Sequence, residues 1–183
     1  MKRLLPILLL LAGTGACAAE YHRIDAARSS IGFVSHQMGV PVAGDFRRFE
    51  ASLAFDPQAS AAAHGTLRIE LASIATGNRE ADAEVAGADW FDVKQHPDAR
   101  FTLNRLESLG GGRWRISGAL ELKGVRRPMA FDAKLADDGA GRALLDGSCV
   151  IKRLDFGIGS GVWGDTSVVA NEVTVRFHLV LER

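Results

Sequence analysis

The stretch VTVRFHLVLE, residues 173–182, decides the fold class of this chain. Its inward candidates are Val173, Val175, Phe177, Leu179 and Leu181, and they alternate with Thr174, Arg176, His178, Val180 and Glu182. Successive side chains of a β-strand point to opposite faces, so an apolar period of two predicts a strand with one buried face.

The same alternation recurs along the chain and predicts seven more strands. They contain Ile31 and Phe33; Leu53 and Phe55; Leu67, Ile69 and Leu71; Phe101 and Leu103; residues 114–122; residues 129–135; and GSCVIK at 147–152. Turn-forming residues such as Asp56-Pro57, Gly110–Gly112 and Asp137–Gly139 separate them. Many short strands at this spacing predict an all-β barrel or sandwich.

One segment, NREADAEVAGADWF at 78–91, departs from the alternation. Asn78 is a suitable N-cap, and Glu80 and Asp82 place acidic groups in the first turn of a helix. We therefore expect one short helix that ends near Gly87. No repeat and no low-complexity linker is present, which predicts a single domain.

The first residues have the layout of a secretory signal peptide. Lys2 and Arg3 precede an apolar run at 4–12, which is too short to span a bilayer, and Ala16 and Ala18 fit a cleavage rule for small residues. We expect a signal peptide at 1–18, a domain at 19–183 and a periplasmic location. Lipidation at Cys17 is the alternative, although no large aliphatic residue stands just before it.

The charges are balanced, with 22 basic and 22 acidic residues, which offers no basic surface for nucleic acid. Cleavage after Ala18 would leave Cys149 as a lone thiol, and its place in an apolar alternation is typical of a buried structural cysteine. Nine of the aromatic residues are Phe and one is Tyr, so the predicted interior is strongly apolar.

Sharper chemistry is not indicated. Residues 159–164, GSGVWG, match a dinucleotide-binding glycine pattern, but a strand rather than a helix is expected after them, so a loop is favoured. The five His have no metal-ligand spacing, and no G-x-S-x-G or Cys–His motif is present. We expect no metal, no cofactor and no catalytic residue.

Several dispersed stretches resemble the YceI-like family of exported lipid-binding proteins. They are SSIGFVSH (29–36), SIATGNREADAEV (73–85), ADWFDVKQHPDARF (88–101), GALELKGVRRP (118–128) and RLDFGIG (153–159). Arg126, and the spacing of Glu80 to Asp82, depart from the family's usual pattern. Neither position is apolar, so the departures affect expectations about head-group contacts and not about the fold.

The resemblance implies an extended, lipocalin-like antiparallel barrel of about eight strands, a number that leaves room for one slender ligand. It also implies that a polyisoprenoid or an isoprenoid quinone is bound inside. The residues we expect to contact it are Phe33, His36, Phe46, Phe49, Trp90, Phe91, Phe101, Phe131 and Phe156.

Each of these assignments has an alternative. An aromatic side chain serves equally well in ordinary core packing, because a core and a pocket wall have the same composition. For His36, a structural hydrogen bond to a neighbouring strand is favoured over a head-group contact. Arg153 and Asp155 suit a cross-strand ion pair better than a head-group contact.

The leading hypothesis is a periplasmic carrier for a long-chain isoprenoid lipid. A module that presents lipid or quinone to a transient membrane-protein partner is the alternative, and a lipid-modifying enzyme is less favoured because no nucleophile is identified. The sequence leaves open which lipid is bound and whether the chain forms a homodimer.

Overall fold

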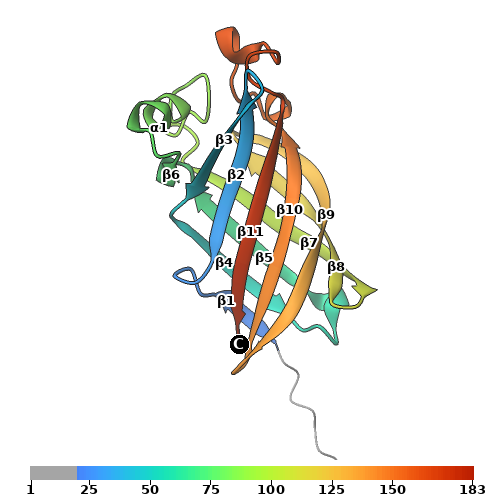
Figure 1. The fold of residues 1–183 in the computed structure, drawn as a ribbon. Helices are drawn as coiled ribbons and strands as arrows, with labels where there is room; N and C mark the ends of the chain where they lie inside the picture. Colours follow the sequence, from blue (N-terminus) through green and yellow to red (C-terminus); the bar gives the residue numbers. More distant parts are fainter. Residues whose placement is uncertain (1–19) are drawn as a thin grey trace, which may run out of the picture.

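The computed structural model describes residues 20–183, in which one antiparallel sheet winds into a tall barrel (Figure 1). The predicted signal peptide at 1–18 and Cys17 lie outside the described residues. The strands are β1 (Tyr21–Ile24), β2 (Ser30–Gln37), β3 (Val40–Phe46), β4 (Phe49–Phe55), β5 (His64–Glu70), β6 (Ile74–Ala75), β7 (Asp98–Gly110), β8 (Arg113–Leu122), β9 (Val125–Gly139), β10 (Arg142–Lys152) and β11 (Glu172–Glu182).

The sheet closes on itself through β1 and β11. The ring runs β1-β4-β5-β7-β8-β9-β10-β11, and Ile24 of β1 pairs with Leu181 of β11 to complete it. β2 pairs with the next part of the same edge of β11, from Thr174 to His178, and carries β3 and β6 beyond it. The predicted all-β, eight-stranded antiparallel barrel with one helix is confirmed.

Tight turns join the long strands at both ends of the barrel. Lys123 and Gly124 link β8 to β9 and have φ values of 49° and 73°. Two successive positive φ angles are characteristic of the hairpin turn that matches strand twist. Ala140 and Gly141 link β9 to β10 with φ values of 50° and 79°.

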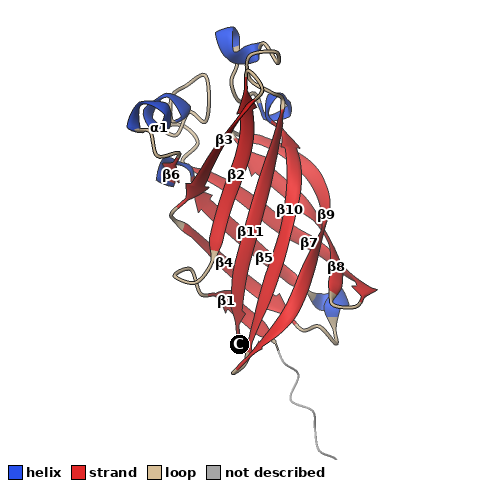
Figure 2. Cartoon of the chain, in the orientation of Figure 1, coloured by secondary structure: helices blue, strands red, loops and turns tan. Residues whose placement is uncertain are grey.

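The predicted helix is present as α1 (Arg79–Val85), between β6 and β7. The Asn78 side chain accepts hydrogen bonds from the backbone N–H groups of Glu80 and Ala81, as an N-cap residue does. Short 3-10 helices occupy Ser60–Ala62, Leu71–Ser73, Arg153–Phe156 and Gly161–Gly164 (Figure 2). No helix within residues 20–183 is long and apolar enough to cross a membrane.

Two clusters of buried side chains pack inside the barrel. The floor cluster lies at the end of the barrel where β1 pairs with β11. It contains Tyr21, Ile31, Phe55, Ala63, Trp114, Ala143, Leu179 and Leu181. The upper cluster, at the end that carries α1, contains Leu71, Ala99, Leu122, Phe156 and Ile158. These clusters leave part of the barrel interior unfilled.

Candidate functional site

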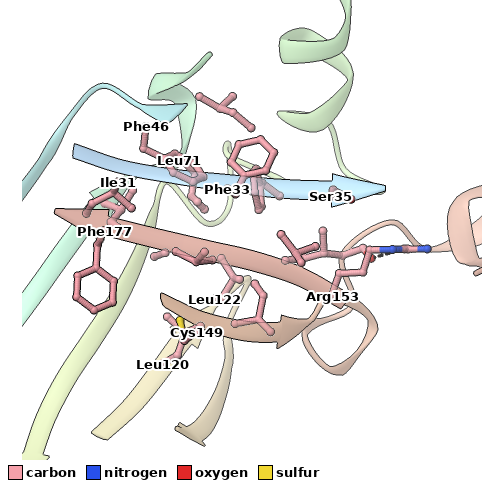
Figure 3. A pocket seen from close by; sticks show the side chains of 18 of the residues that line it. Ile31, Phe33, Ser35, Phe46, Leu71, Leu120, Leu122, Cys149, Arg153 and Phe177 are labelled. Atoms are coloured by element: carbon pink, nitrogen blue, oxygen red, sulfur yellow. Dashed lines mark hydrogen bonds between the residues drawn. The ribbon is translucent and has the colours of Figure 1, made fainter. Parts of the chain in front are cut away.

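A cavity of about 460 Å³ occupies the barrel interior. Its volume lies within the range of ordinary small-molecule pockets. Inward side chains of β2, β3, β5 and β7–β11 line it, together with residues of α1 and of the loop after it. Figure 3 shows Phe33 and Phe46 on one side of this space, with Leu120 and Cys149 on another. Nearly all of the lining is apolar.

Two chains of aromatic contacts run along the cavity wall. Phe46 lies between Phe33 and Phe91, with ring centroids 5.8 Å and 6.2 Å away. On the other wall Phe131 lies between Phe101 and Phe177, each 5.6 Å away. Edge-on and tilted ring contacts of this kind stabilise aromatic side chains beyond simple burial. The wall therefore consists of mutually supported rings.

Glycines on neighbouring strands contact two of these rings. Gly44 pairs with Phe33, and a Cβ atom at Gly44 would stand 2.7 Å from Cζ of that ring. Gly147 pairs with Phe177 in the same way, and a Cβ atom at Gly147 would collide with that ring. At these two positions the ring packs against bare backbone, and a side chain on the glycine would displace it.

Arg153 is the most deeply buried charged residue of the described chain, with 1% of its surface exposed. Its guanidinium donates to the backbone carbonyls of Ile158, Gly159, Trp163, Val169 and Ala170. Burial lowers the pKa of this guanidinium. The expected ion pair is wrong, because five carbonyl oxygens of the 153–171 loop surround the group and no carboxylate contacts it.

Arg153 therefore holds the loop at the upper end of the barrel. In Figure 3 its guanidinium points away from Phe33 and Phe46, toward that loop. Its Cζ lies 5.8 Å from the ring centroid of Trp90, and the Trp90 ring lies 5.6 Å from that of Trp163. Trp163 Nε1 donates to Glu84 of α1 at 3.1 Å. Trp163 thus ties the loop to α1, whereas Nε1 of Trp90 is buried without a hydrogen-bond partner.

The cavity brings together six of the residues that the sequence analysis proposed for ligand contact. They are Phe33, Phe46, Trp90, Phe91, Phe101 and Phe131. Their contact with a ligand stays a prediction.

The other three lie outside the lining. His36 is exposed, since Phe33 and Ser35 face inward and an even-numbered neighbour in the same strand faces out. Phe49 packs against the floor cluster, and Phe156 belongs to the upper cluster. Their role in ligand binding therefore gains no support from the geometry.

Several lining residues were missed. Phe177 and Trp163 both reach the cavity. Alternation in 173–182 already placed Phe177 on the inward face, so its position was available in the sequence. Trp163 had no such signal, because it belongs to a glycine-rich loop whose path depends on Arg153.

Cys149 also lines the cavity, from β10. Burial raises the pKa of its thiol to about 11, so the thiol stays protonated and unreactive at neutral pH. Within residues 20–183, no three His, Cys, Asp or Glu side chains are grouped so as to hold a metal ion. The described residues therefore form an apolar cavity wall.

Comparisons with known proteins agree with this geometry. A solved structure of BcnA from Burkholderia cenocepacia superposes with a TM-score of 0.82 at 39% identity, covering 86% of this chain and 98% of that one. A polyisoprenoid-binding domain from Saccharophagus degradans superposes at 0.72 with 21% identity, over 89% of this chain and 98% of its own, and so shows the fold alone.

Curated relatives are similar over most of their length. A UPF0312 protein of Photorhabdus laumondii is 32% identical over 155 residues, 81% of this chain and 80% of that protein. One from Shewanella baltica is 33% identical over 168 residues, 86% of this chain and 87% of that protein. The YceI-like domain model matches residues 22–181. The chain therefore belongs to the YceI-like family.

Proposed function

We propose that this protein is a periplasmic carrier that holds a long-chain isoprenoid lipid, such as a polyisoprenoid or an isoprenoid quinone, inside its barrel. The observation that carries the proposal is the apolar cavity of about 460 Å³, walled by supported aromatic rings. The fold shared with a polyisoprenoid-binding domain supports the same ligand class.

The cavity can bind such a chain without a charged anchor. Burying a few hundred Å² of apolar chain contributes on the order of 10 kcal/mol, and association costs remove several of these. The two charged lining residues, Arg153 and Glu84, are already engaged in hydrogen bonds to the loop and to Trp163. Affinity must therefore come from the length and shape of the apolar chain.

The export predicted from the sequence is consistent with a carrier outside the cytoplasm. The signal-like segment at 1–18 predicts secretion. An enclosed apolar site would shield a poorly soluble prenyl chain from water while the protein carries it. Fractionation of cells that express the full chain tests the location: the protein should be released with the periplasmic contents, and retention with the membrane would indicate lipidation at Cys17.

Binding is tested by purifying the protein from cells, extracting it with organic solvent and identifying the lipid by mass spectrometry. Protein refolded from denaturant without lipid should then take up a prenyl alcohol, as measured by native mass spectrometry. If the refolded barrel takes up no prenyl chain, the carrier proposal is wrong.

A matched pair of variants separates cavity binding from adhesion to the surface. Leu120→Trp adds bulk to the cavity wall, whereas Glu121→Trp adds the same side chain to the outer face of the same strand. We expect Leu120→Trp to weaken prenyl-alcohol binding about tenfold or more and Glu121→Trp to leave it unchanged. Equal effects would place the lipid outside the barrel.

Presentation of the lipid to a membrane protein is the second candidate. Three exposed apolar side chains lie at the upper end: Met38 in the turn before β3, Val40 at the start of β3 and Val162 in the 3-10 helix Gly161–Gly164. The Met38 N–H donates to the Val168 carbonyl and so joins the β2–β3 turn to the loop that follows β10. A Met38→Ser/Val162→Ser variant should keep lipid binding and lose capture of a partner from solubilised membranes. Unchanged capture would reject this surface as the partner site.

A further inference from the structure

The hydrogen-bond ladder between β9 and β10 stops before either strand ends. Its last pair in that direction joins Gly147 to Ala133, yet β10 continues to Lys152 and β9 extends back to Val125. Over the same stretches β9 stays paired with β8 and β10 stays paired with β11. Figure 1 shows β9 curving away from β10 over this length. The barrel wall is therefore parted along one seam.

The sequence keeps this seam from closing. Leu122 and Val125 flank the two-residue turn, so they form a hydrogen-bonded pair, and alternate β9 residues from Arg126 onward direct their backbone groups away from β8. Pro128 is one of those residues, and its missing N–H therefore belongs to the edge that faces β10. Proline at such an edge prevents regular pairing.

The seam is bounded at both of its ends. Below, it ends at the pair of Gly147 and Ala133. Above, Arg127 Nε donates to the carbonyl of Asp155 at 3.4 Å, and Lys123 Nζ donates to that of Gly157 at 2.9 Å. These bonds tie the β8–β9 turn and the start of β9 to the segment that follows β10. The unpaired stretches of β9 before Ala133 and of β10 after Gly147 thus form an opening in the wall, which we call the window. Strand pairing bounds the window below, and side-chain hydrogen bonds bound it above.

A surface cleft of about 680 Å³ lies in this window. Residues of both unpaired edges line it, among them Pro128, Ala130, Ser148 and the exposed Val150. Met129, Phe131 and Cys149 line the cleft and also line the internal cavity. Because the same three residues border both spaces, only a single layer of side chains separates the cavity from solvent there.

We propose that the window between β9 and β10 is a side portal of the cavity, through which a prenyl chain too long for the interior extends out of the barrel. The inference rests on the proposed function. A short chain lies wholly inside, while a long chain keeps its first part in the cavity and passes its remainder between Met129, Phe131 and Cys149. Chain length is then not limited by the volume of the cavity.

Closing the window tests the portal. Continuation of the register past Gly147 and Ala133 would place Val150 opposite Ala130, so Ala130→Cys/Val150→Cys draws the strands together when oxidised. A disulfide at Lys134→Cys/Asp146→Cys joins the same strands where they are already paired and serves as the control. Farnesol, a short prenyl alcohol, and solanesol, a long one, are the probes, and native mass spectrometry measures binding before and after reduction.

We expect the oxidised window variant to bind farnesol as the unmodified protein does and solanesol about tenfold more weakly, with full recovery on reduction. The control disulfide should change neither affinity. Unchanged solanesol binding in the oxidised window variant would overturn the portal. Failure of the unmodified protein to bind either alcohol would instead reject the carrier function.

A second variant covers the case in which the strands cannot approach closely enough to form the bond. Ser148→Trp fills the cleft from its rim, and Ser52→Trp places the same side chain on the outer face of β4. Selective loss of solanesol binding in Ser148→Trp alone supports the portal, and equal solanesol binding in the two variants rejects it.

Discussion

The floor of the barrel and its upper half are built from the same alternating strands, yet one is packed and the other is hollow. At the floor, Phe55 meets Trp114 edge-on at 5.3 Å and Tyr21 at 6.0 Å, so the rings fill the centre. Higher up, Phe33 rests on Gly44 and borders the open cavity, while Phe177 rests on Gly147, borders the same cavity and also packs against the floor cluster. Aromatic side chains therefore fill the core at one end of the barrel and form the cavity wall at the other.

Truncating one ring in each half should expose this difference most strongly. Trp114→Ala should lower the free energy of unfolding by about 3–5 kcal/mol, because it leaves a void in a filled core. Phe101→Ala should cost only about 1–2 kcal/mol, because that ring already borders an open space. Urea unfolding of lipid-free protein measures both, and equal losses would mean that the two halves are equally well packed.

Arg153 offers the next largest effect, confined to the upper half. Arg153→Met removes the shared donor to five carbonyls and should destabilise the loop by about 3 kcal/mol, since buried carbonyls lose their partners. Arg176→Met, on the exposed outer face of β11, is the matched control and should be nearly silent.

Hydrogen exchange locates the effect of Arg153→Met. Residues 153–171 should lose protection, while the strands around Trp114 should keep theirs. Uniform loss of protection along the whole chain would show instead that the two halves unfold as one unit. The two halves would then have no separate free energies of unfolding to compare.

Gly147→Ala adds a side chain against a ring that borders the cavity. The new methyl group collides with the Phe177 ring and pushes it from the wall, which should lower stability by about 1–2 kcal/mol and weaken lipid binding. Adding Phe177→Leu should restore part of both, because the two sites are in contact. Gly164→Ala, where a Cβ atom meets open space, is the control. Additive effects of Gly147→Ala and Phe177→Leu would contradict the contact.

Most of the secondary structure could be predicted from the sequence. Alternation located eight strands, and Asn78 located the helix, because both signals are local. The strand β3 was missed because Pro41 and Gly44 interrupt its apolar residues, although Gly44 is what makes room for Phe33. Leu71 was assigned to a strand but lies in a 3-10 turn just beyond β5.

The division between core and cavity was out of reach for the sequence. Phe49 and Phe131 are the same residue type in similar alternation, and each pairs with an isoleucine, yet Phe49 packs against the floor cluster and Phe131 lines the cavity. Arg153 was expected in an ion pair because a lone sequence does not reveal that a loop will fold back and surround it with carbonyls.

The smallest expected effect concerns the acid that anchors α1 beside the cavity. The Asp82 carboxylate accepts hydrogen bonds from the backbone N–H of Thr76 at 2.8 Å and from its hydroxyl at 2.7 Å, and these bonds hold the pKa of Asp82 below its usual value. A lowered carboxyl pKa contributes stability that is complete above the unfolded-state value, about 3.9, and is lost as the pH falls through the folded-state value.

Asp82→Asn should therefore loosen α1 slightly at neutral pH and flatten its acid response below about pH 4. Glu80→Gln, on the same helix and hydrogen-bonded to Asn78 only through its backbone, should leave that response intact. Fluorescence of Trp163, whose indole N–H donates to Glu84 of α1, reports the loosening against pH. Because the floor cluster makes no contact with Asp82, global unfolding should shift little, and a large shift in the urea midpoint would show that α1 is coupled to the packed half.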